Sequence, residues 1–277
     1  MHAYVVNLAR SPDRRAHISA QLARTGIQYE VVPAVDGREL DLGNTELFDP
    51  ALIRRSGFRP GAAGCALSHL EVYRRVLADG RDQALVLEDD VNLPADLAIV
   101  ADAVAAEMSA TEVVLLNFHS IEPCRITNAG SVRLPSSRRL VHLVDEAQAS
   151  STGAYMITRE ACRRMLQTCL PLRSQPDDWA LFHQEGSIDV LRCVVPMVVT
   201  NALKFRTTID YYHPGSMQAR VREAVASAKV PIIYQALALR RRRTFQRAGW
   251  TGQTELIAGP GLTMLSPAPA KSADGGR

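Results

Sequence analysis

Three adjacent carboxylates, Glu88, Asp89 and Asp90, directly follow the apolar run Ala84–Leu87. A short continuous apolar run is typical of a strand that is buried on both faces, as in a parallel sheet. Open α/β sheets bind their ligands at the carboxyl ends of the strands, so we expect the three acids at a binding edge. Adjacent carboxylates repel one another unless a cation lies between them, and oxygen ligands of this kind suit Mg²⁺ or Mn²⁺. The alternative, from these residues alone, is a solvated turn after a strand.

A second acidic pair, Asp177 and Asp178, precedes Trp179. An aspartate beside a tryptophan in a loop suits sugar recognition, because the indole ring can pack on a pyranose face. The same residues also suit an ordinary capped start of a helix over residues 179–184. The chain therefore offers carboxylates in two separate places.

The first residues predict a strand, a helix and a second strand. Residues 3–8 are apolar and β-branched, Ser11-Pro12-Asp13 favours a helix start, Gly26 favours its end, and residues 29–33 again suit a strand. This order predicts a parallel βαβ unit, with polar side chains gathered at the carboxyl edge of its strands. Arginine suits phosphate and a carboxylate can accept from ribose hydroxyls, so this edge is a candidate nucleotide site. Those side chains are Asn7, Arg14, Arg15 and Asp36, and each of them taken singly also suits an ordinary cap or turn.

A glycine-containing stretch, residues 61–69, leads into a helical pattern over residues 70–77. Glycines before a helix favour anion binding at its N-terminus, although this stretch matches neither common phosphate-loop motif. His69, considered alone, is more typical of a buried structural histidine than of a ligand or a base. Further along, residues 94–108 suit a helix, residues 113–117, 154–157 and 191–199 suit strands, and residues 121–139 suit a hairpin or a loop.

The composition is that of an ordinary globular protein, with 277 residues, 47% hydrophobic and 22% charged. The five cysteines form no C-x-x-C pair, so we expect reduced thiols in the core rather than a disulfide framework or a zinc site. No apolar stretch reaches the roughly 18 residues of a membrane span, and the first residues do not suggest a secretory signal. We therefore expect a cytoplasmic protein.

The net charge of +3 is unevenly distributed, because residues 219–247 carry seven arginines and one lysine against one glutamate. Residues 217–229 and 232–247 suit two helices, and the second continues an apolar face into Arg240–Arg243. A basic amphipathic helix can lie on an anionic membrane surface, bind nucleic acid or form a solvated helix end. We expect a peripheral membrane contact through Arg240–Arg243 and no nucleic-acid partner.

Several short blocks, read together and in order, resemble glycosyltransferase family 25, which includes lipopolysaccharide-biosynthesis enzymes and collagen galactosyltransferases. The resemblance covers residues 3–200, and its specificity comes from the order of the blocks. The blocks are Val6-Asn7-Leu8, Asp13-Arg14-Arg15, Ala34-Val35-Asp36-Gly37, Gly64-Cys65-Ala66-Leu67-Ser68-His69, Leu87-Glu88-Asp89-Asp90, Thr152-Gly153-Ala154-Tyr155-Met156-Ile157 and Pro176-Asp177-Asp178.

The resemblance implies an α/β fold of the GT-A (Rossmann-like) type and an inverting transfer of a hexose, most often galactose, from a UDP-sugar with the help of Mn²⁺ or Mg²⁺. It implies Asp90 as the direct metal ligand, with Glu88 and His213 as further candidates, and Asp177 or Asp178 as the general base. The acceptor would be a saccharide or glycolipid such as lipopolysaccharide. The donor site would comprise Asn7, Leu8, Arg14, Arg15, Asp36, Gly64, Ser68, His69, Glu88 and Asp89, without a choice between Arg14 and Arg15.

We expect a catalytic domain over residues 1–215, a basic helical extension over 216–258 and a disordered tail over 259–277. The extension would hold the enzyme at the inner face of the cytoplasmic membrane. Two alternatives remain from the sequence. One is a metal-dependent phosphohydrolase that uses the same acidic triplet, and the other is an inactive relative that binds a nucleotide sugar without turnover.

Overall fold

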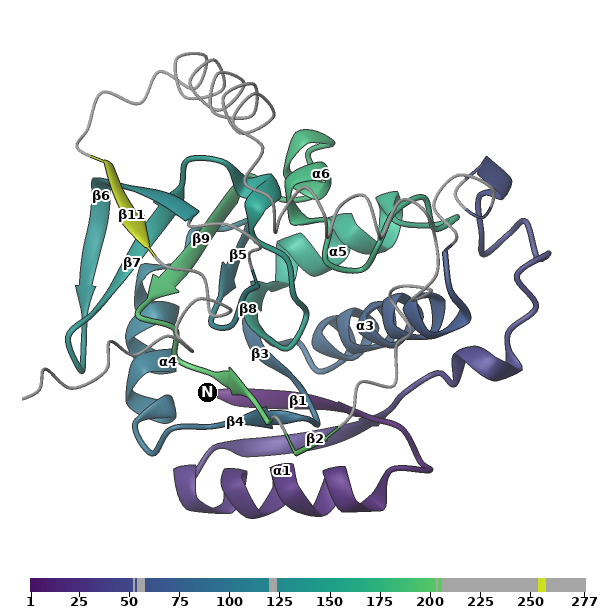
Figure 1. Ribbon diagram of the computed structural model, residues 1–277, viewed down its shortest axis with the longest axis horizontal. Coiled ribbons are helices and arrows are strands. Elements are labelled where there is room, and N and C mark those ends of the chain that lie inside the picture. The colour runs from purple at the N-terminus through teal and green to yellow at the C-terminus, as the bar shows by residue number, and fades with distance from the viewer. Residues whose placement is uncertain (52, 54–57, 120–123, 203, 206–253, 258–277) are drawn as a thin grey trace, which may run out of the picture.

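The computed structural model describes residues 1–51, 53, 58–119, 124–202, 204–205 and 254–257. Its centre is a nine-stranded mixed sheet in the order β11-β6-β7-β9-β5-β8-β3-β1-β2, with helices on both faces (Figure 1). Two short strands, β4 (Val91–Asn92) and β10 (Thr200–Asn201), form a separate antiparallel pair. The predicted α/β class is therefore confirmed.

The chain opens with the predicted βαβ unit: β1 (His2–Asn7), α1 (Pro12–Thr25) and β2 (Gln28–Pro33), with β1 and β2 parallel. Pro12 occupies the first turn of α1, where its missing N–H costs nothing. Gly26 ends the helix with a φ of 72°, a left-handed conformation that glycine adopts without strain. On the other side of β1 lies the apolar strand β3 (Gln83–Glu88), also parallel.

The other elements include both helices and strands. They are η1 (Gly37–Glu39), α3 (Pro60–Ala78), α4 (Leu97–Glu107), β5 (Glu112–Leu115), β6 (Cys124–Leu134), β7 (Arg138–Leu143), η2 (Glu146–Gln148), β8 (Ala154–Thr158), α5 (Arg159–Thr168), α6 (Trp179–Gln184), β9 (Val190–Val195) and β11 (Thr254–Ile257). The region for which a hairpin or loop was predicted is a hairpin, since β6 and β7 pair antiparallel.

One antiparallel strand interrupts the parallel part of the sheet. β8 lies between β3 and β5 and pairs antiparallel with both, so β3 and β5 run in the same direction. The chain segment before β8 therefore reaches the edge at which β1, β3 and β5 end. This topology brings residues 150–153 to the end of the acidic strand.

Each central strand sends alternate side chains into two separate cores. Tyr4 and Val86 pack with α3, α5 and α6 on one face, whereas Val5 and Leu87 pack with α1 and α4 on the other (Figure 1). Burial on both faces explains why residues 84–87 form a continuous apolar run instead of an alternating one. The two cores fix β1 and β3, and thereby the polar residues at their ends.

The C-terminal expectations lie largely outside the described residues, which include neither the two basic helices over 217–247 nor the tail over 259–277. Within the expected helical extension, Thr254–Ile257 form a strand, β11, that pairs with β6, which the sequence did not predict. Among the helices that the structure describes, none combines the length and apolar composition needed to cross a membrane. All five cysteines have free thiols, as expected.

Candidate active site

The acidic triplet lies where β3 ends, beside the end of β1. Asn7 donates from Nδ2 to Asp89 Oδ2 at 2.6 Å, and Arg14 donates to Asp89 Oδ1 at 3.0 Å. Arg14 also forms an ion pair with Asp90 Oδ2 at 3.0 Å. Asn7, Arg14 and Asp89 are all buried, so these contacts fix the triplet relative to the first βαβ unit. Arg15 is exposed, and the structure thus separates the two arginines that the sequence left open.

Asp89 and Asp90 differ in what their oxygens can still bind. Both oxygens of Asp89 already accept hydrogen bonds from protein groups. Asp90 is partly exposed, and burial, followed by the negative charge of Glu88, raises its pKa to about 6. A carboxylate held next to other carboxylates, with oxygen available to solvent, fits Mg²⁺ or Mn²⁺. Asp90 is therefore the member of the triplet best placed to hold such an ion.

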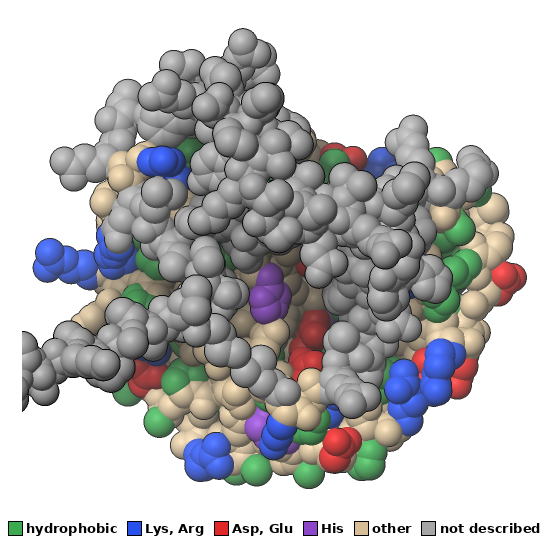
Figure 2. Space-filling view, viewed as in Figure 1, with side chains coloured by type: hydrophobic (Ala, Val, Ile, Leu, Met, Phe, Trp, Pro, Cys, Tyr) green, Lys and Arg blue, Asp and Glu red, His purple; other side chains and the backbone are tan. Residues whose placement is uncertain are grey.

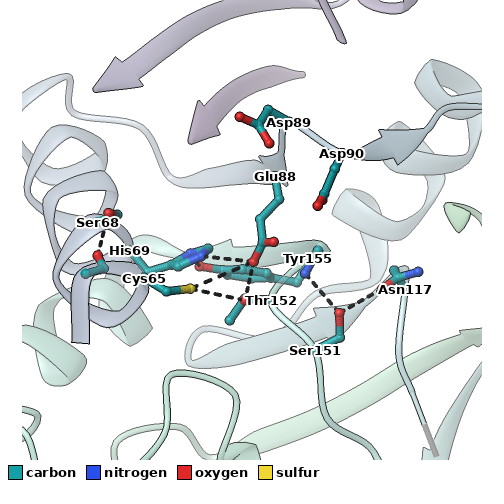
Figure 3. A network of polar contacts seen from close by, with 12 residues as sticks. Cys65, Ser68, His69, Glu88, Asp89, Asp90, Asn117, Ser151, Thr152 and Tyr155 are labelled. Atoms are coloured by element: carbon teal, nitrogen blue, oxygen red, sulfur yellow. Dashed lines mark hydrogen bonds and ion pairs between the residues drawn. The ribbon is translucent and has the colours of Figure 1, made fainter. Parts of the chain in front are cut away.

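Glu88 points in another direction from its two neighbours. Figure 3 shows its carboxylate directed toward Thr152, Cys65 and His69, whereas the Asp89 side chain is directed away from them. The Thr152 hydroxyl donates to Glu88 Oε1, and His69 Nε2 lies 3.6 Å from the same oxygen. Burial acts to raise the pKa of Glu88, but its contacts with His69 and Thr152 outweigh burial and lower it. Glu88 is accordingly a charged group inside a polar cluster.

His69 is held in place by a chain of hydroxyl groups. Its Nδ1 lies 2.7 Å from the Tyr155 hydroxyl, which lies 3.0 Å from the Tyr73 hydroxyl. All three rings are buried, and within the described part of the chain His69 Nε2 has no hydrogen-bond partner. His69 is therefore a buried histidine with one ring nitrogen held by Tyr155 and the other facing Glu88.

Gly64 and Ser68 pack α3 against the loop that follows β2. A side chain at Gly64 would place its Cβ 2.5 Å from Val35 O. The Ser68 hydroxyl accepts from Val35 N at 2.9 Å and donates to Gly64 O at 2.6 Å. The helix begins at Pro60, so the predicted glycine turn before a helix at residue 70 is wrong: Gly61 lies in the first turn of the helix, and Gly64 lies inside it and allows close packing.

An open pocket with a volume of about 320 Å³ extends from the triplet to the loop after β2. Figure 2 shows acidic side chains in a hollow near the middle of the molecular face. At the other end of the pocket Asp36 forms ion pairs with Arg10 and Arg38, whose hydrogen bonds hold its pKa well below the usual range. The pocket is lined by Val6, Leu8, Arg10, Arg14, Ala34, Val35, Asp36, Gly37, Arg38, Arg59, Pro60, Gly61, Cys65, Ser68, Glu88 and Asp89.

The two aspartates of the later pair have different surroundings. Burial, followed by the charges of Glu88 and Asp178, raises the pKa of Asp177 to about 6. The pKa of Asp178 is raised by burial and by the charge of Glu185, which lies at the far end of α6. Trp179 anchors this turn by donating from its indole nitrogen to Ser151 O at 2.9 Å. Asp177 is therefore the one that interacts electrostatically with the triplet and that suits a proton acceptor near it.

Sequence reasoning did not select four polar residues that the fold brings to this edge. Cys65 and Thr152 contact Glu88, and Ser151 donates to Asn117 Oδ1 at 2.7 Å. Ser151 has a φ of 150°, a conformation that is unfavourable for a residue with a side chain. The block Thr152–Ile157 contributed to the family resemblance, but the sequence did not predict that Thr152 contacts Glu88. His213 and Arg240–Arg243 lie outside the described residues.

Comparisons with known proteins agree on one family. Residues 1–180 match the model of glycosyltransferase family 25 (LPS biosynthesis protein). A glycosyltransferase 25 family member of Aedes aegypti is 35% identical over 99 residues, which is 32% of this chain and 16% of the relative. The human protein named inactive glycosyltransferase 25 family member 3 is 30% identical over 181 residues, or 61% of this chain and 29% of the relative. Mouse procollagen galactosyltransferase 2 is 31% identical over 97 residues, or 32% and 15%.

These matches cover less than a third of the length of each of the three relatives. Residues 1–180, which the family model matches, contain the acidic triplet and the pocket.

Proposed function

This chain belongs to glycosyltransferase family 25, and we propose that it transfers a hexose, namely galactose, from a UDP-sugar to a saccharide acceptor with inversion. One observation supports the proposal: Glu88 and Asp89, the latter held by bonds from Asn7 and Arg14, line one end of a pocket whose other end holds Asp36 and basic side chains, and Asp90 follows them directly. A nucleoside diphosphate fits this arrangement. Its ribose hydroxyls would face Asp36, and its diphosphate would face the acidic triplet.

The pocket residues suggest how the donor would lie. Asp36 is charged and partly accessible, so it can accept hydrogen bonds from ribose hydroxyls. Asp90, with Glu88 beside it, would hold Mn²⁺ or Mg²⁺, which neutralises the negative charge of the departing diphosphate. Arg14 has a different task, since it holds Asp89 and Asp90 in position. The orientation of the donor is thus set by groups that the two hydrophobic cores fix.

Asp177 would remove the proton from the acceptor hydroxyl. An inverting transfer needs one base on the face of the sugar opposite to the leaving group. A pKa of about 6 keeps most of the Asp177 carboxylate deprotonated at neutral pH, while leaving it more basic than an ordinary aspartate. The attachment of Trp179 to Ser151 O fixes the turn that carries this base. Asp178 would cap α6 and take no part in the proton transfer.

The acceptor class follows from the relatives only in outline. The family description names lipopolysaccharide biosynthesis, and one relative is named a procollagen galactosyltransferase. We propose a saccharide or glycolipid acceptor, such as lipopolysaccharide or lipooligosaccharide, reached by a cytoplasmic enzyme that touches the inner membrane through Arg240–Arg243. Deletion of residues 219–277 should reduce co-sedimentation with anionic vesicles. Unchanged sedimentation would remove the membrane part of the proposal without affecting the transfer reaction.

A donor screen tests the central proposal. The purified chain is incubated with Mn²⁺, a panel of nucleotide sugars and saccharide acceptors, and the release of UDP is followed. We expect release from UDP-galactose that depends on acceptor and is lost in Asp90→Ala. If UDP-galactose and UDP-glucose are both inert, or if Asp90→Ala retains full activity, the proposal fails. Release of inorganic phosphate without an acceptor would instead indicate a phosphohydrolase.

A catalytically inactive, sugar-nucleotide-binding protein is the second candidate, and the human relative named inactive favours it. Such a protein would bind UDP, detected by calorimetry, yet release none from any donor in the same screen. The separate position of Asp177 near the triplet favours the active enzyme, because a protein that only binds the donor needs no base there.

A further inference from the structure

Three potential metal ligands of different chemical types meet beside the pocket. Cys65 Sγ, His69 Nε2 and a carboxylate oxygen of Glu88 all lie within 4.8 Å of one another. Glu88 Oε1 is 3.9 Å from Cys65 Sγ and 3.6 Å from His69 Nε2. Ligand atoms of a tetrahedral zinc ion lie about 3.3–3.7 Å apart at the usual bond lengths. Two of the three separations are therefore close to those of a zinc site, and the third, between Cys65 Sγ and His69 Nε2, needs a shift of at most about 1 Å.

The position of His69 is an independent sign of a missing partner. Its side chain is 2% exposed, and among the described residues Nε2 has no hydrogen-bond partner, with Glu88 Oε1 facing it at 3.6 Å. A buried polar nitrogen without a partner carries a desolvation cost that a bound cation would remove. The other ring nitrogen is held by the Tyr155 hydroxyl at 2.7 Å. Metal-binding histidines typically have such a partner on the second nitrogen, because it orients the ring.

We propose that Cys65, His69 and Glu88 form a binding site for Zn²⁺ next to Asp90, and that a Zn²⁺ ion bound there draws Glu88 away from the oxygen-ligand site at Asp90. Thiolate and imidazole favour Zn²⁺, whereas Mg²⁺ and Mn²⁺ favour carboxylate oxygens. The Cys65 thiol releases its proton to solvent on coordination, His69 binds through neutral Nε2, and Glu88 binds through Oε1. Water or the Thr152 hydroxyl, which already contacts Glu88 Oε1, completes the fourth position.

The site has a consequence for the pocket. Cys65 and Glu88 both line it, so a bound Zn²⁺ ion occupies part of its wall and holds Glu88 away from any ligand there. Zn²⁺ should therefore inhibit transfer that Mn²⁺ supports. This consequence depends on the proposed function, whereas the binding of Zn²⁺ does not, and the two can fail separately.

Cobalt substitution gives a direct test that needs no activity. Co²⁺ is added to the full chain in excess Mg²⁺, and the near-ultraviolet thiolate-to-cobalt absorption is recorded, followed by displacement with Zn²⁺. We expect one equivalent bound with this absorption. Cys65→Ser should abolish the absorption, and Cys65→Ser and His69→Gln should each weaken Zn²⁺ binding by at least about 100-fold, since even an outer partner of a ligand is worth about 10–100-fold. Tyr155→Phe should weaken it by roughly 10-fold or more.

Cys162→Ala is the matched control, because Cys162 is a buried thiol on α5 outside the cluster. It should leave both the absorption and the Zn²⁺ affinity unchanged. Circular dichroism establishes that each variant is folded, and His69→Gln replaces Cys65→Ser as the deciding variant if the latter does not fold. The proposal is overturned if the wild-type chain shows no thiolate absorption with Co²⁺. It is equally overturned if Cys65→Ser or His69→Gln binds Zn²⁺ as tightly as the wild-type chain.

Discussion

Buried carboxylates occur at both ends of the parallel strands of the central sheet, and the two groups differ in how many positive charges lie beside them. At the start of β5, Glu112 is fully buried and forms an ion pair with Arg192 of β9. Arg192 donates to Glu112 Oε2 at 3.0 Å, and the Ser109 hydroxyl donates to the same oxygen at 2.9 Å. One negative charge thus meets one positive charge, and the carboxylate oxygens have partners.

At the carboxyl end of β3 the balance is different. Glu88, Asp89 and Asp90 are adjacent, and their charges act on one another and on Asp177. Within the described part of the chain, the guanidinium that pairs with Asp89 and Asp90 is that of Arg14. Burial, followed by the negative charge of Glu88, raises the pKa values of both Asp90 and Asp177 to about 6. The ion pair between Glu112 and Arg192 contributes to stability. The carboxylates at the end of β3 outnumber the nearby positive charges, so a bound cation or a proton is needed to offset their repulsion.

Breaking the balanced pair should have the largest effect on stability. Arg192→Ala leaves the Glu112 charge buried without its partner, so the free energy of unfolding should fall by about 3–5 kcal/mol. Urea denaturation followed by circular dichroism measures this change. The double variant Glu112→Leu/Arg192→Met is the control, because replacing both charges by apolar groups is often close to neutral. A loss below about 1 kcal/mol in the single variant would show that the pair is not a structural one.

Removing the expected base at the other edge should affect turnover rather than folding. Asp177→Asn should lower kcat by about 100–10,000-fold, the usual contribution of a general base, with little change in the midpoint of urea denaturation. Asp178→Asn is the matched control next to it and should lower kcat by less than about 10-fold, since it loses no proton-transfer step. UDP release at saturating donor measures both. Equal losses in the two variants, or a larger loss in Asp178→Asn, would contradict the assignment of Asp177.

Loosening the support of the triplet should have an intermediate effect. Asn7→Ala removes the amide that donates to Asp89 Oδ2 and leaves a buried, charged acceptor short of one bond, at a cost of about 1.5–3 kcal/mol in unfolding free energy. Urea denaturation measures it, and KM for the donor should rise as the triplet loses its position. Arg15→Ala, on the exposed side of α1, should change neither quantity. A variant that loses stability while KM stays unchanged would show that Asn7 does not position the site.

The pH dependence of turnover should report Asp177 directly. A base must be deprotonated, so with a pKa of about 6 in Asp177 the rate should be constant above pH 7 and fall toward a tenfold loss per pH unit below about pH 6. The measurement is kcat from pH 5 to 8 at a fixed Mn²⁺ concentration. A rate that stays constant down to pH 5 would contradict Asp177 as the base.

The sequence predicted the elements near the triplet because their signals are local. Pro12 and Gly26 mark both ends of α1, and the apolar run before Glu88 identifies a strand buried on both faces. The helix over residues 179–184 follows from its acidic start in the same way. Local periodicity and capping encode such features within about one turn or a few residues.

The contacts that complete the site depend on pairing between distant segments, which no local pattern shows. Thr152 meets Glu88 because β8 inserts antiparallel between β3 and β5, with Leu87 opposite Ala154. Arg192 meets Glu112 across 80 residues for a similar reason. The start of α3 at Pro60 had a local signal, proline in the first turn, but the glycines that follow it favoured a loop. The close packing that Gly64 allows depends on the loop after β2, which lies against it in the folded chain.

The smallest expected change is in the unfolding free energy of Asp90→Asn. It separates the two ends of the sheet most clearly, because it is an increase, whereas the change at Glu112 is a decrease. In the folded chain the pKa of Asp90 is raised from 3.8 to about 6, so folding favours the protonated form. The resulting stability is fully present below pH 3.8 and is lost as the pH rises through about 6. Asp90→Asn should therefore raise the unfolding free energy at pH 8, without divalent cations, by about 1 kcal/mol, as substitutions at strained functional sites often do. The gain should vanish near pH 4.

Glu112→Gln, by contrast, should destabilise the chain at pH 8, because it weakens the ion pair with Arg192. If both variants change stability at pH 8 in the same direction, the triplet carries no excess charge and the distinction between the two edges is wrong.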